Sequence, residues 1–365
     1  MHRKTVLIAG ASGVVGHAAL EHFAGLPGWR VIALSRRRPE LPAGFDGVHL
    51  SVDLTDAQAC RQAIAAHPEV THLVYAALFE KPGLVRGWRE RDQMQTNLGM
   101  LRNLVEPLVQ HAPGLRHVSL LQGTKAYGVH LHPVAIPARE SSPRDPHENF
   151  YWLQEDWLRE QAATAGFGFT LWRPQLVFGD AVGVAMNLVP VIGAYAAICR
   201  ELGQPFAYPG GPSNVLEATD ARLLARAFAW AADAPAARDE TFNVTNGDVF
   251  VWRNLWPALA DALDMPTGPD AAMSMAAFLP AHAGTWQRIV AKHGLRPIAL
   301  PDLLGESHHY ADFCFGFHAR EAPPPVIVST IKLRQAGFAD CIDTEQMFRD
   351  WFGALRARGI LPPPG

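Results

Sequence analysis

Three glycines near the start of the chain have the spacing of a phosphate-binding turn. Gly10, Gly13 and Gly16 follow a short apolar run and stand where a helical pattern begins. The first glycine permits a tight turn, the second lets backbone N–H groups approach a diphosphate, and the third lets the helix pack closely on the strand. Because a helix N-terminus carries partial positive charge, this order predicts a dinucleotide-binding turn. The expected contacts are Gly10, Ser12, Gly13, Val14, Val15 and Gly16.

The end of the next expected strand indicates which dinucleotide binds. Enzymes that use NAD usually carry Asp or Glu there, which holds the ribose 2′-hydroxyl. This chain has Ser35 followed by Arg36, Arg37 and Arg38. Guanidinium groups bind a 2′-phosphate that a carboxylate would repel, so the sequence predicts NADP(H) as the cofactor, held by Ser35, Arg36 and Arg37.

A tyrosine at an expected helix start is the candidate for chemistry on a substrate. The GxxGxxG spacing resembles that of the extended short-chain dehydrogenases, which usually carry Tyr-x-x-x-Lys on one helix. There the lysine lowers the pKa of a tyrosine that serves the substrate oxygen. Here Glu155 stands four residues after Tyr151. Taken alone, this segment also fits a nucleotide-sensing protein without catalysis.

Alternating strands and helices must position these residues. Strands that are apolar throughout are typical of a parallel sheet buried on both faces. The alternation predicts a doubly wound Rossmann α/β domain at 1–180. Strands are expected at 5–9, 30–35, 48–52, 71–76, 115–121 and 168–173, and helices at 13–25, 56–66, 91–111 and 149–165.

After Gly179 the pattern becomes mostly helical and predicts a smaller substrate-binding region at 181–365. One strand signal at 240–244 is expected to return to the large sheet, so that the two regions interleave. Helices are expected at 184–202, 220–233, 251–264 and 344–358.

One segment within this region, 181–199, carries no charge and is nearly as long as a membrane span. Asn187, Pro190 and the lack of a second such segment favour a buried helix at the substrate cleft instead.

The composition is that of an ordinary globular protein. Of the 365 residues, 48% are hydrophobic and 18% are charged, and the net charge of −3 gives no indication of nucleic acid binding. Four separated cysteines predict neither disulfides nor a metal site and fit a reducing, cytoplasmic setting. No metal is expected either. The four residues that could suggest one have a spacing that fits no common zinc pattern: His308, His309, Cys314 and His318. The lack of GxSxG argues against a hydrolase, and a homodimer stays open.

Three motifs carry a more specific resemblance. They are Gln122-Gly-Thr-Lys125, Asn149-Phe-Tyr151 with Glu155-Asp156, and Phe242-Asn-Val-Thr-Asn-Gly-Asp248. From about residue 5 to its end the chain resembles the progesterone 5β-reductase and iridoid synthase type of short-chain dehydrogenase. In that family the lysine comes from a strand end. The resemblance therefore implies Lys125 and Tyr151 as the catalytic pair.

The resemblance also implies a reaction and further contacts. The reaction is NADPH-dependent 1,4-reduction of the C=C bond of an enone, a small apolar carbonyl compound. Alternatives are an epimerase or dehydratase of nucleotide sugars and a non-catalytic NADP sensor. Because Val129-His130 replaces the Pro-Phe of plant members, the substrate does not carry over, and 184–186 lack a serine that often contacts the cofactor. The further cofactor contacts implied are Asp53, Leu54, Arg173 and Val177.

Overall fold

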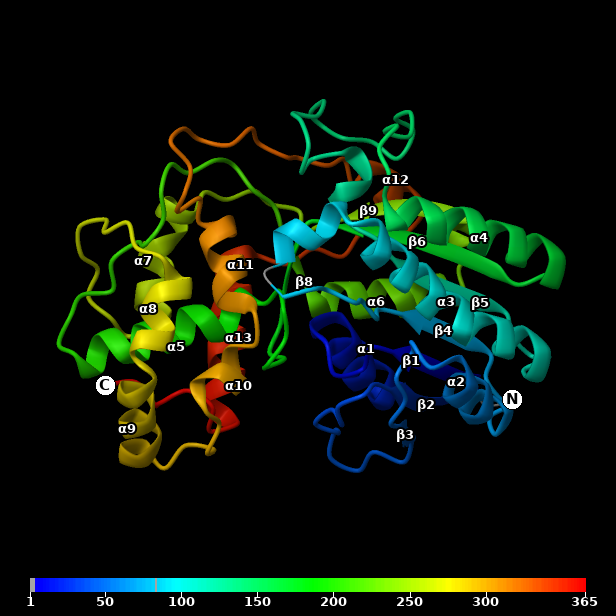
Figure 1. The fold of residues 1–365 in the computed structure, drawn as a ribbon, viewed down its shortest axis with the longest axis horizontal. Helices are drawn as coiled ribbons and strands as arrows, with labels where there is room; N and C mark the ends of the chain where they lie inside the picture. Colours follow the sequence, from blue (N-terminus) through cyan, green and yellow to red (C-terminus); the bar gives the residue numbers. More distant parts are fainter. Residues whose placement is uncertain (1–3, 83) are drawn as a thin grey trace.

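The computed structural model describes residues 4–82 and 84–365. Its main sheet has seven parallel strands in the order β3-β2-β1-β4-β5-β6-β9. The sheet and a mostly helical C-terminal region lie side by side (Figure 1), which confirms the expected Rossmann fold class. The strands are β1 Lys4–Ala9, β2 Trp29–Leu34, β3 Val48–Leu50, β4 His72–Tyr75, β5 His117–Leu121, β6 Gly168–Pro174 and β9 Glu240–Val244.

Helices cover both faces of this sheet. In β1, Val6 and Ile8 pack into one helical layer and Leu7 and Ala9 into the other, because successive side chains of a strand point to opposite faces. All four are fully buried, which explains the uninterrupted apolar run in the sequence. The first layer contains α1 Val14–Gly25 and α6 Ala221–Ala231, and the second contains α2 Ala57–Ala65, α3 Arg91–His111 and α4 Phe150–Ala165.

The C-terminal helices surround a second core rich in aromatic side chains. Trp252 packs edge-on against Phe250 and Phe315, and Phe348 packs against Phe178. Strand β9 pairs with β6, as the signal at 240–244 predicts, and α6 also packs on the sheet, against α1. The other helices are α5 Leu188–Glu201, α7 Trp252–Ala262, α8 Met275–Ala281, α9 Ala283–His293, α10 Leu300–Leu304, α11 Ser307–Cys314, α12 Ile331–Gln335 and α13 Thr344–Ala357.

Several of these elements are absent from the sequence prediction. They are helices α8 to α12 and a separate pair of parallel strands, β7 Leu176–Phe178 and β8 Ala218–Asp220. The pair matters for the site because β7 directly follows β6 and leads the chain from the sheet toward the helical region.

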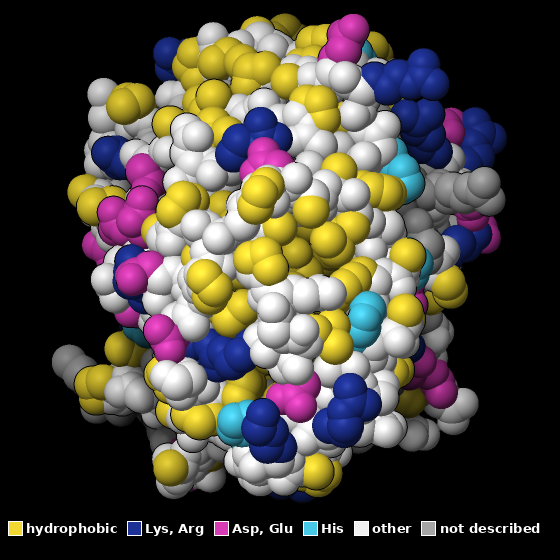
Figure 2. All heavy atoms as spheres, turned by 90° about the vertical axis from the view of Figure 1, so that its left-hand side faces the viewer, with side chains coloured by type: hydrophobic (Ala, Val, Ile, Leu, Met, Phe, Trp, Pro, Cys, Tyr) yellow, Lys and Arg dark blue, Asp and Glu magenta, His cyan; other side chains and the backbone are white. Residues whose placement is uncertain are grey.

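The uncharged segment 181–199 contains a helix that is buried along most of its length, as expected. However, α5 begins only at Leu188, and the cleft is lined by 183–186 and not by α5. The expectation that this helix faces the substrate is therefore wrong. Among residues 4–82 and 84–365, no helix combines the length and apolar character needed to cross a membrane. Figure 2 shows charged side chains mixed with apolar ones on the outer face of this region.

Candidate active site

A deep cleft with a cavity volume of about 1090 Å³ lies between the sheet and the C-terminal helices. The residues that follow β1, β2, β4 and β5 line one side of it, and residues 183–186 and α11 line the other. Open parallel sheets bind their ligands at the carboxyl ends of the strands. The cleft is therefore where the predicted site residues should meet.

The glycine turn at the base of the cleft has no room for side chains. Gly10 has a φ of +83°, and a Cβ there would lie 2.7 Å from the carbonyl oxygen of Ala76. A Cβ at Gly16 would overlap the carbonyl of Gly10. Gly13 precedes α1 without any side-chain cap, so the first N–H groups of the helix have no side-chain partner there. This cradle fits a diphosphate; Gly16 lies beneath it and does not line the cavity.

Arg36 and Arg37, which follow β2, both line the cavity but differ in how many contacts their guanidinium groups already make. The Arg36 side chain is 70% exposed and makes one long ion pair, 3.9 Å from Asp53. Arg37 reaches across the cleft and donates to the carbonyl of Gly183 at 3.1 Å. The Ser35 hydroxyl donates to the Arg37 carbonyl at 2.7 Å. Arg36 is thus the more available cation for a 2′-phosphate.

Asp53 and Leu54 both line the same end of the cavity. Asp53 accepts hydrogen bonds from the backbone N–H and hydroxyl of Thr55, at 2.9 and 2.8 Å, and these hold its pKa below the usual range. The N-cap of α2 is Asp56, which accepts from two amides of the first turn. An acid at position 53 could also be explained as a helix cap. Because Asp56 caps α2, Asp53 does not have that role.

Lys125 and Tyr151 meet near the middle of the cleft. Lys125 lies in a short 3₁₀ helix after β5, and its Nζ is 5.9 Å from the centroid of the Tyr151 ring. Within the described residues nothing is hydrogen-bonded to the Tyr151 hydroxyl, which lies beside Gly123 on the cavity wall. Burial raises the pKa of Tyr151, so the phenol keeps its proton at neutral pH. The structure thus brings the Lys125 amine and the Tyr151 phenol to the wall of the same cavity.

A single amide side chain fixes the backbone at both of these residues. Asn149 is the N-cap of α4, and its Oδ1 accepts from the backbone N–H of Tyr151 at 3.0 Å. Its Nδ2 donates to the carbonyl of Lys125 at 3.1 Å. The Asn that precedes Phe-Tyr in the sequence motif therefore couples the helix start to the strand end.

Glu155 occupies the place of the lysine in the commoner helix motif, and it has a structural role. Its Oε2 accepts from Gln122 at 3.0 Å and lies 3.5 Å from Arg173. Arg173 also donates to Gln122 at 3.0 Å. Arg173, predicted to contact the cofactor, is buried behind Gln122 and does not line the cavity, whereas Val177 does.

The cleft also contains a buried acid, Glu80, which no sequence motif predicts. Its side chain is 6% exposed, and its Oε1 lies 3.9 Å from Lys125 Nζ. Burial lowers the pKa of Lys125 to about 8 and raises that of Glu80, while each charge opposes the shift of the other. Glu80 follows β4, which lies between β1 and β5 in the sheet. An acid five residues after the end of a central strand is the sequence feature that could have indicated Glu80 as a site residue.

Comparison with known proteins agrees with this geometry. The NAD dependent epimerase/dehydratase family matches residues 6–245, more than half of the chain. The chain belongs to this family.

Curated relatives confirm the narrower resemblance. The chain is 28% identical to (S)-8-oxocitronellyl enol synthase of Antirrhinum majus, over 99% of this chain and 94% of the relative. It is 29% identical to 3-oxo-Delta(4,5)-steroid 5-beta-reductase of Arabidopsis thaliana, over 98% and 92%. Both are enzymes of the iridoid synthase and 5β-reductase type that the motifs indicate.

Solved structures support the fold alone. The Bordetella bronchiseptica enzyme WbmH in complex with NAD⁺ aligns with a TM-score of 0.68 at 16% identity, over 98% of this chain and 99% of that one. UDP-glucose 4-epimerase of Thermus thermophilus aligns with a TM-score of 0.65 at 19% identity, over 96% and 99%. A dinucleotide, NAD or NADP, is typical of this epimerase/dehydratase family.

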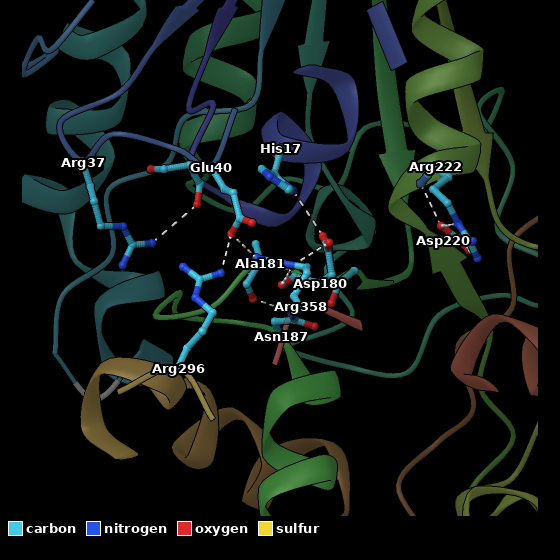
Figure 3. A network of polar contacts seen from close by, with 12 residues as sticks. His17, Arg37, Glu40, Asp180, Ala181, Asn187, Asp220, Arg222, Arg296 and Arg358 are labelled. Atoms are coloured by element: carbon cyan, nitrogen blue, oxygen red, sulfur yellow. Dashed lines mark hydrogen bonds and ion pairs between the residues drawn. The ribbon is translucent and has the colours of Figure 1, made fainter. Parts of the chain in front are cut away.

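In this family member a polar network links the Rossmann layer to the C-terminal helices (Figure 3). His17 of α1 contacts Asp180 at 3.2 Å, and Asp180 accepts from Arg358 at 2.7 Å. Glu40 accepts from Arg358 at 2.9 Å and from Arg296 at 2.8 Å. The network thus joins α1, the loop after β2 and the end of α13.

The same residues include a cluster that resembles a metal site. Within the described part of the chain, His17, Glu21 and Asp180 are the group of His, Cys or acid side chains close enough to share an ion. The guanidinium of Arg358 already neutralises Asp180. The residues whose spacing fits no common zinc pattern, His308, His309, Cys314 and His318, are not such a group.

We expect His17→Gln to lower stability in a pH-dependent way. Burial lowers the pKa of His17, but the hydrogen bond and charge of Asp180 outweigh it, so the net pKa is raised. The stabilisation is therefore complete below the unfolded pKa of about 6.5 and is lost as pH rises through the folded pKa. Near pH 6 the cost should be about 2 kcal/mol of unfolding free energy.

Denaturant unfolding at several pH values, about 5.5 to 9, measures this effect. The difference between wild type and His17→Gln should shrink as pH rises. His22, on the same helix, has its pKa lowered by burial, so His22→Gln should not show this trend. A wild-type advantage that stays constant over the whole range would rule out the ion pair.

Proposed function

We propose that the chain is an NADPH-dependent reductase of the C=C bond of an enone. The observation that carries the proposal is the meeting of Lys125 and Tyr151 at a cavity wall, with the Tyr151 hydroxyl unpartnered by the described residues. The names of the relatives, an enol synthase and a 3-oxo-Δ4,5-steroid 5β-reductase, support the same class of substrate. In this proposal, 1–180 with β9 hold the cofactor and 181–365 complete the substrate side.

The residues of the chain supply the environment for this reaction. When bound, the nicotinamide supplies a hydride to the β-carbon of the enone. Negative charge then builds on the carbonyl oxygen, which the Tyr151 hydroxyl stabilises as a hydrogen-bond donor. The ammonium of Lys125 next to the phenol favours negative charge in this part of the site. The apolar side chains of Phe150, Phe313 and Phe315 line the cavity and offer apolar surface to such a substrate.

A second candidate is an enzyme acting on nucleotide sugars, as the solved epimerases do. Their likeness to this chain lies in the fold, at 14–19% identity. In this chain Glu155 replaces the helix lysine of the Tyr-x-x-x-Lys motif and is bound to Gln122 and Arg173. The arrangement therefore favours the enone reductase.

Product analysis tests the proposed reaction. The protein is incubated with NADPH and either progesterone or a simple cyclic enone, and the products are separated and identified. A saturated ketone is the expected result. An allylic alcohol would mean direct carbonyl reduction, and no oxidation of NADPH over an enone panel would favour the non-catalytic sensor.

The same proposal predicts that Arg36→Ala weakens NADPH binding about tenfold while NADH binding hardly changes. A tenfold loss corresponds to about 1.4 kcal/mol, typical of one charge-assisted hydrogen bond to the 2′-phosphate. Arg37→Ala should discriminate less, because the Arg37 guanidinium is already bound to the 182–183 carbonyls. The Arg36, Arg37 double variant should show the largest preference change.

Titrations of both cofactors by fluorescence provide the measurement. Arg38→Ala is the matched control, since Arg38 does not line the cavity. Equal losses of NADPH and NADH affinity in the double variant would remove the 2′-phosphate assignment.

A further inference from the structure

The segment after β4 is held in one conformation by two side chains of α3. Asn97 is fully buried and binds the backbone of Phe79 twice: its Oδ1 accepts from the N–H at 2.9 Å and its Nδ2 donates to the carbonyl at 2.9 Å. One turn earlier, Gln93 accepts from the backbone N–H of Lys81 at 3.1 Å. Glu80 lies between these two anchored residues, so its backbone has little freedom.

Gln93 also holds the side chain of Glu80. Its Nε2 donates to Glu80 Oε2 at 2.8 Å. The other carboxylate oxygen, Oε1, is buried without a hydrogen bond and lies 3.9 Å from Lys125 Nζ. Gly87 permits this arrangement, since a Cβ there would collide with the Gln93 amide. One oxygen is thus anchored to α3 and the other faces Lys125.

We propose that Glu80 is a positioning residue that keeps Lys125 in its ammonium form beside Tyr151. The importance of this role for catalysis rests on the proposed function. The charge of Lys125 can be measured without any reaction. A buried acid without a hydrogen bond on one oxygen is costly unless a cation compensates it, and among the side chains that the structure describes Lys125 is the cation paired with Glu80.

The other groups around Lys125 cannot take over this role. Its Nζ lies 4.0 Å from the ring centroid of Trp88, a contact that favours a cation without supplying a counter-charge. Burial raises the pKa of both Tyr151 and Tyr310, and burial lowers that of His130 to about 4, so these three are uncharged at neutral pH. Among the described residues, Glu80 is the acid paired with Lys125.

The pair has a consequence for the reaction. With a pKa of about 8, Lys125 is close to losing its proton at physiological pH even with Glu80 present. Without the carboxylate, the amine would be mostly neutral, and the positive charge next to Tyr151 would be lost. Because the ion pair has no net charge, the cleft can also accept an uncharged apolar substrate at low electrostatic cost.

Titration of the lysine amines tests the proposal directly. The chain has five lysines, so reductive methylation with ¹³C-formaldehyde gives few NMR signals, and Lys125→Arg identifies the one of interest. Glu80→Gln should lower the pKa of this amine by about one unit or more, as loss of an opposite charge within ~4–6 Å does. Glu106→Gln, on the exposed side of α3, should leave it unchanged.

A pH profile of unmethylated protein provides the second readout. The ratio of wild-type to Glu80→Gln kcat for the enone should grow as pH rises from about 6 to 9. Glu80→Asp, which retains the charge at a longer distance from Lys125, should show a smaller effect in the same direction. This variant replaces Glu80→Gln in the test if Glu80→Gln does not fold. An unchanged Lys125 titration in the variants would overturn the proposal. Failure of the wild type to reduce any enone would instead overturn the proposed function and leave the titration result standing.

Discussion

Replacing Tyr151 by Phe is expected to slow enone reduction by about two orders of magnitude or more, while cofactor affinity hardly changes. The substitution removes one hydroxyl, and loss of a single oxyanion donor typically costs that much in kcat. The Tyr151 hydroxyl is free to act in this way because the described residues offer it no hydrogen bond. The ring itself stays, so packing against Phe150 is retained.

Steady-state kinetics and NADPH titration on the same preparations separate the two effects. Tyr195→Phe is the matched control, because the Tyr195 hydroxyl donates to the carbonyl of Ala207 in the helical core and does not line the cavity. That variant should lose some stability but little rate. Full activity in Tyr151→Phe would remove Tyr151 from the mechanism.

The Rossmann half of the chain could be predicted because its signals are local. The strand Lys4–Ala9 is buried on both faces and therefore reads as a continuous apolar run. Of the glycines that follow it, Gly16 is required by a contact only a few residues away, with the carbonyl of Gly10. Sequence and structure agree where neighbours in the chain determine the conformation.

The C-terminal half was harder because its elements are short and depend on distant contacts. Helix α5 begins at Leu188 and not earlier because Asn187 caps it and donates to the carbonyls of Gly179 and Ala181, at 2.7 and 2.8 Å. These bonds hold 181–187 as a loop, which an uncharged sequence does not reveal. Helices such as Leu300–Leu304 contain too few residues to show a helical period.

The candidate site divides in the same manner. Lys125 and Tyr151 could be named from motifs, and the geometry that joins them, through Asn149, is consistent with that assignment. Glu80 belongs to no motif, and its importance arises only where the ends of β4 and β5 come together in the sheet. For Arg173, the motif suggested a contact with the cofactor. In the structure its guanidinium donates to Gln122 and pairs with Glu155 instead.

Lys125→Met is expected to reduce kcat by about tenfold to a hundredfold and also to destabilise the protein. The rate falls because the positive charge beside the developing oxyanion is lost, an effect of the same kind as removal of a donor. Stability falls by about 3 kcal/mol, because Glu80 is left buried without its cation and must take up a proton or stay uncompensated. Methionine keeps most of the side-chain volume, so a cavity contributes little.

Combining Lys125→Met with Glu80→Gln separates the two effects. Removing both members of a buried ion pair costs less than removing one, so the double variant should recover most of the lost stability in denaturant unfolding. The rate should not recover, because the ammonium is still absent. If the rate returned together with stability, Lys125 would be a structural residue whose loss had merely disturbed the cleft. If neither returned, the two side chains would not act as a pair, since their effects on folding would simply add.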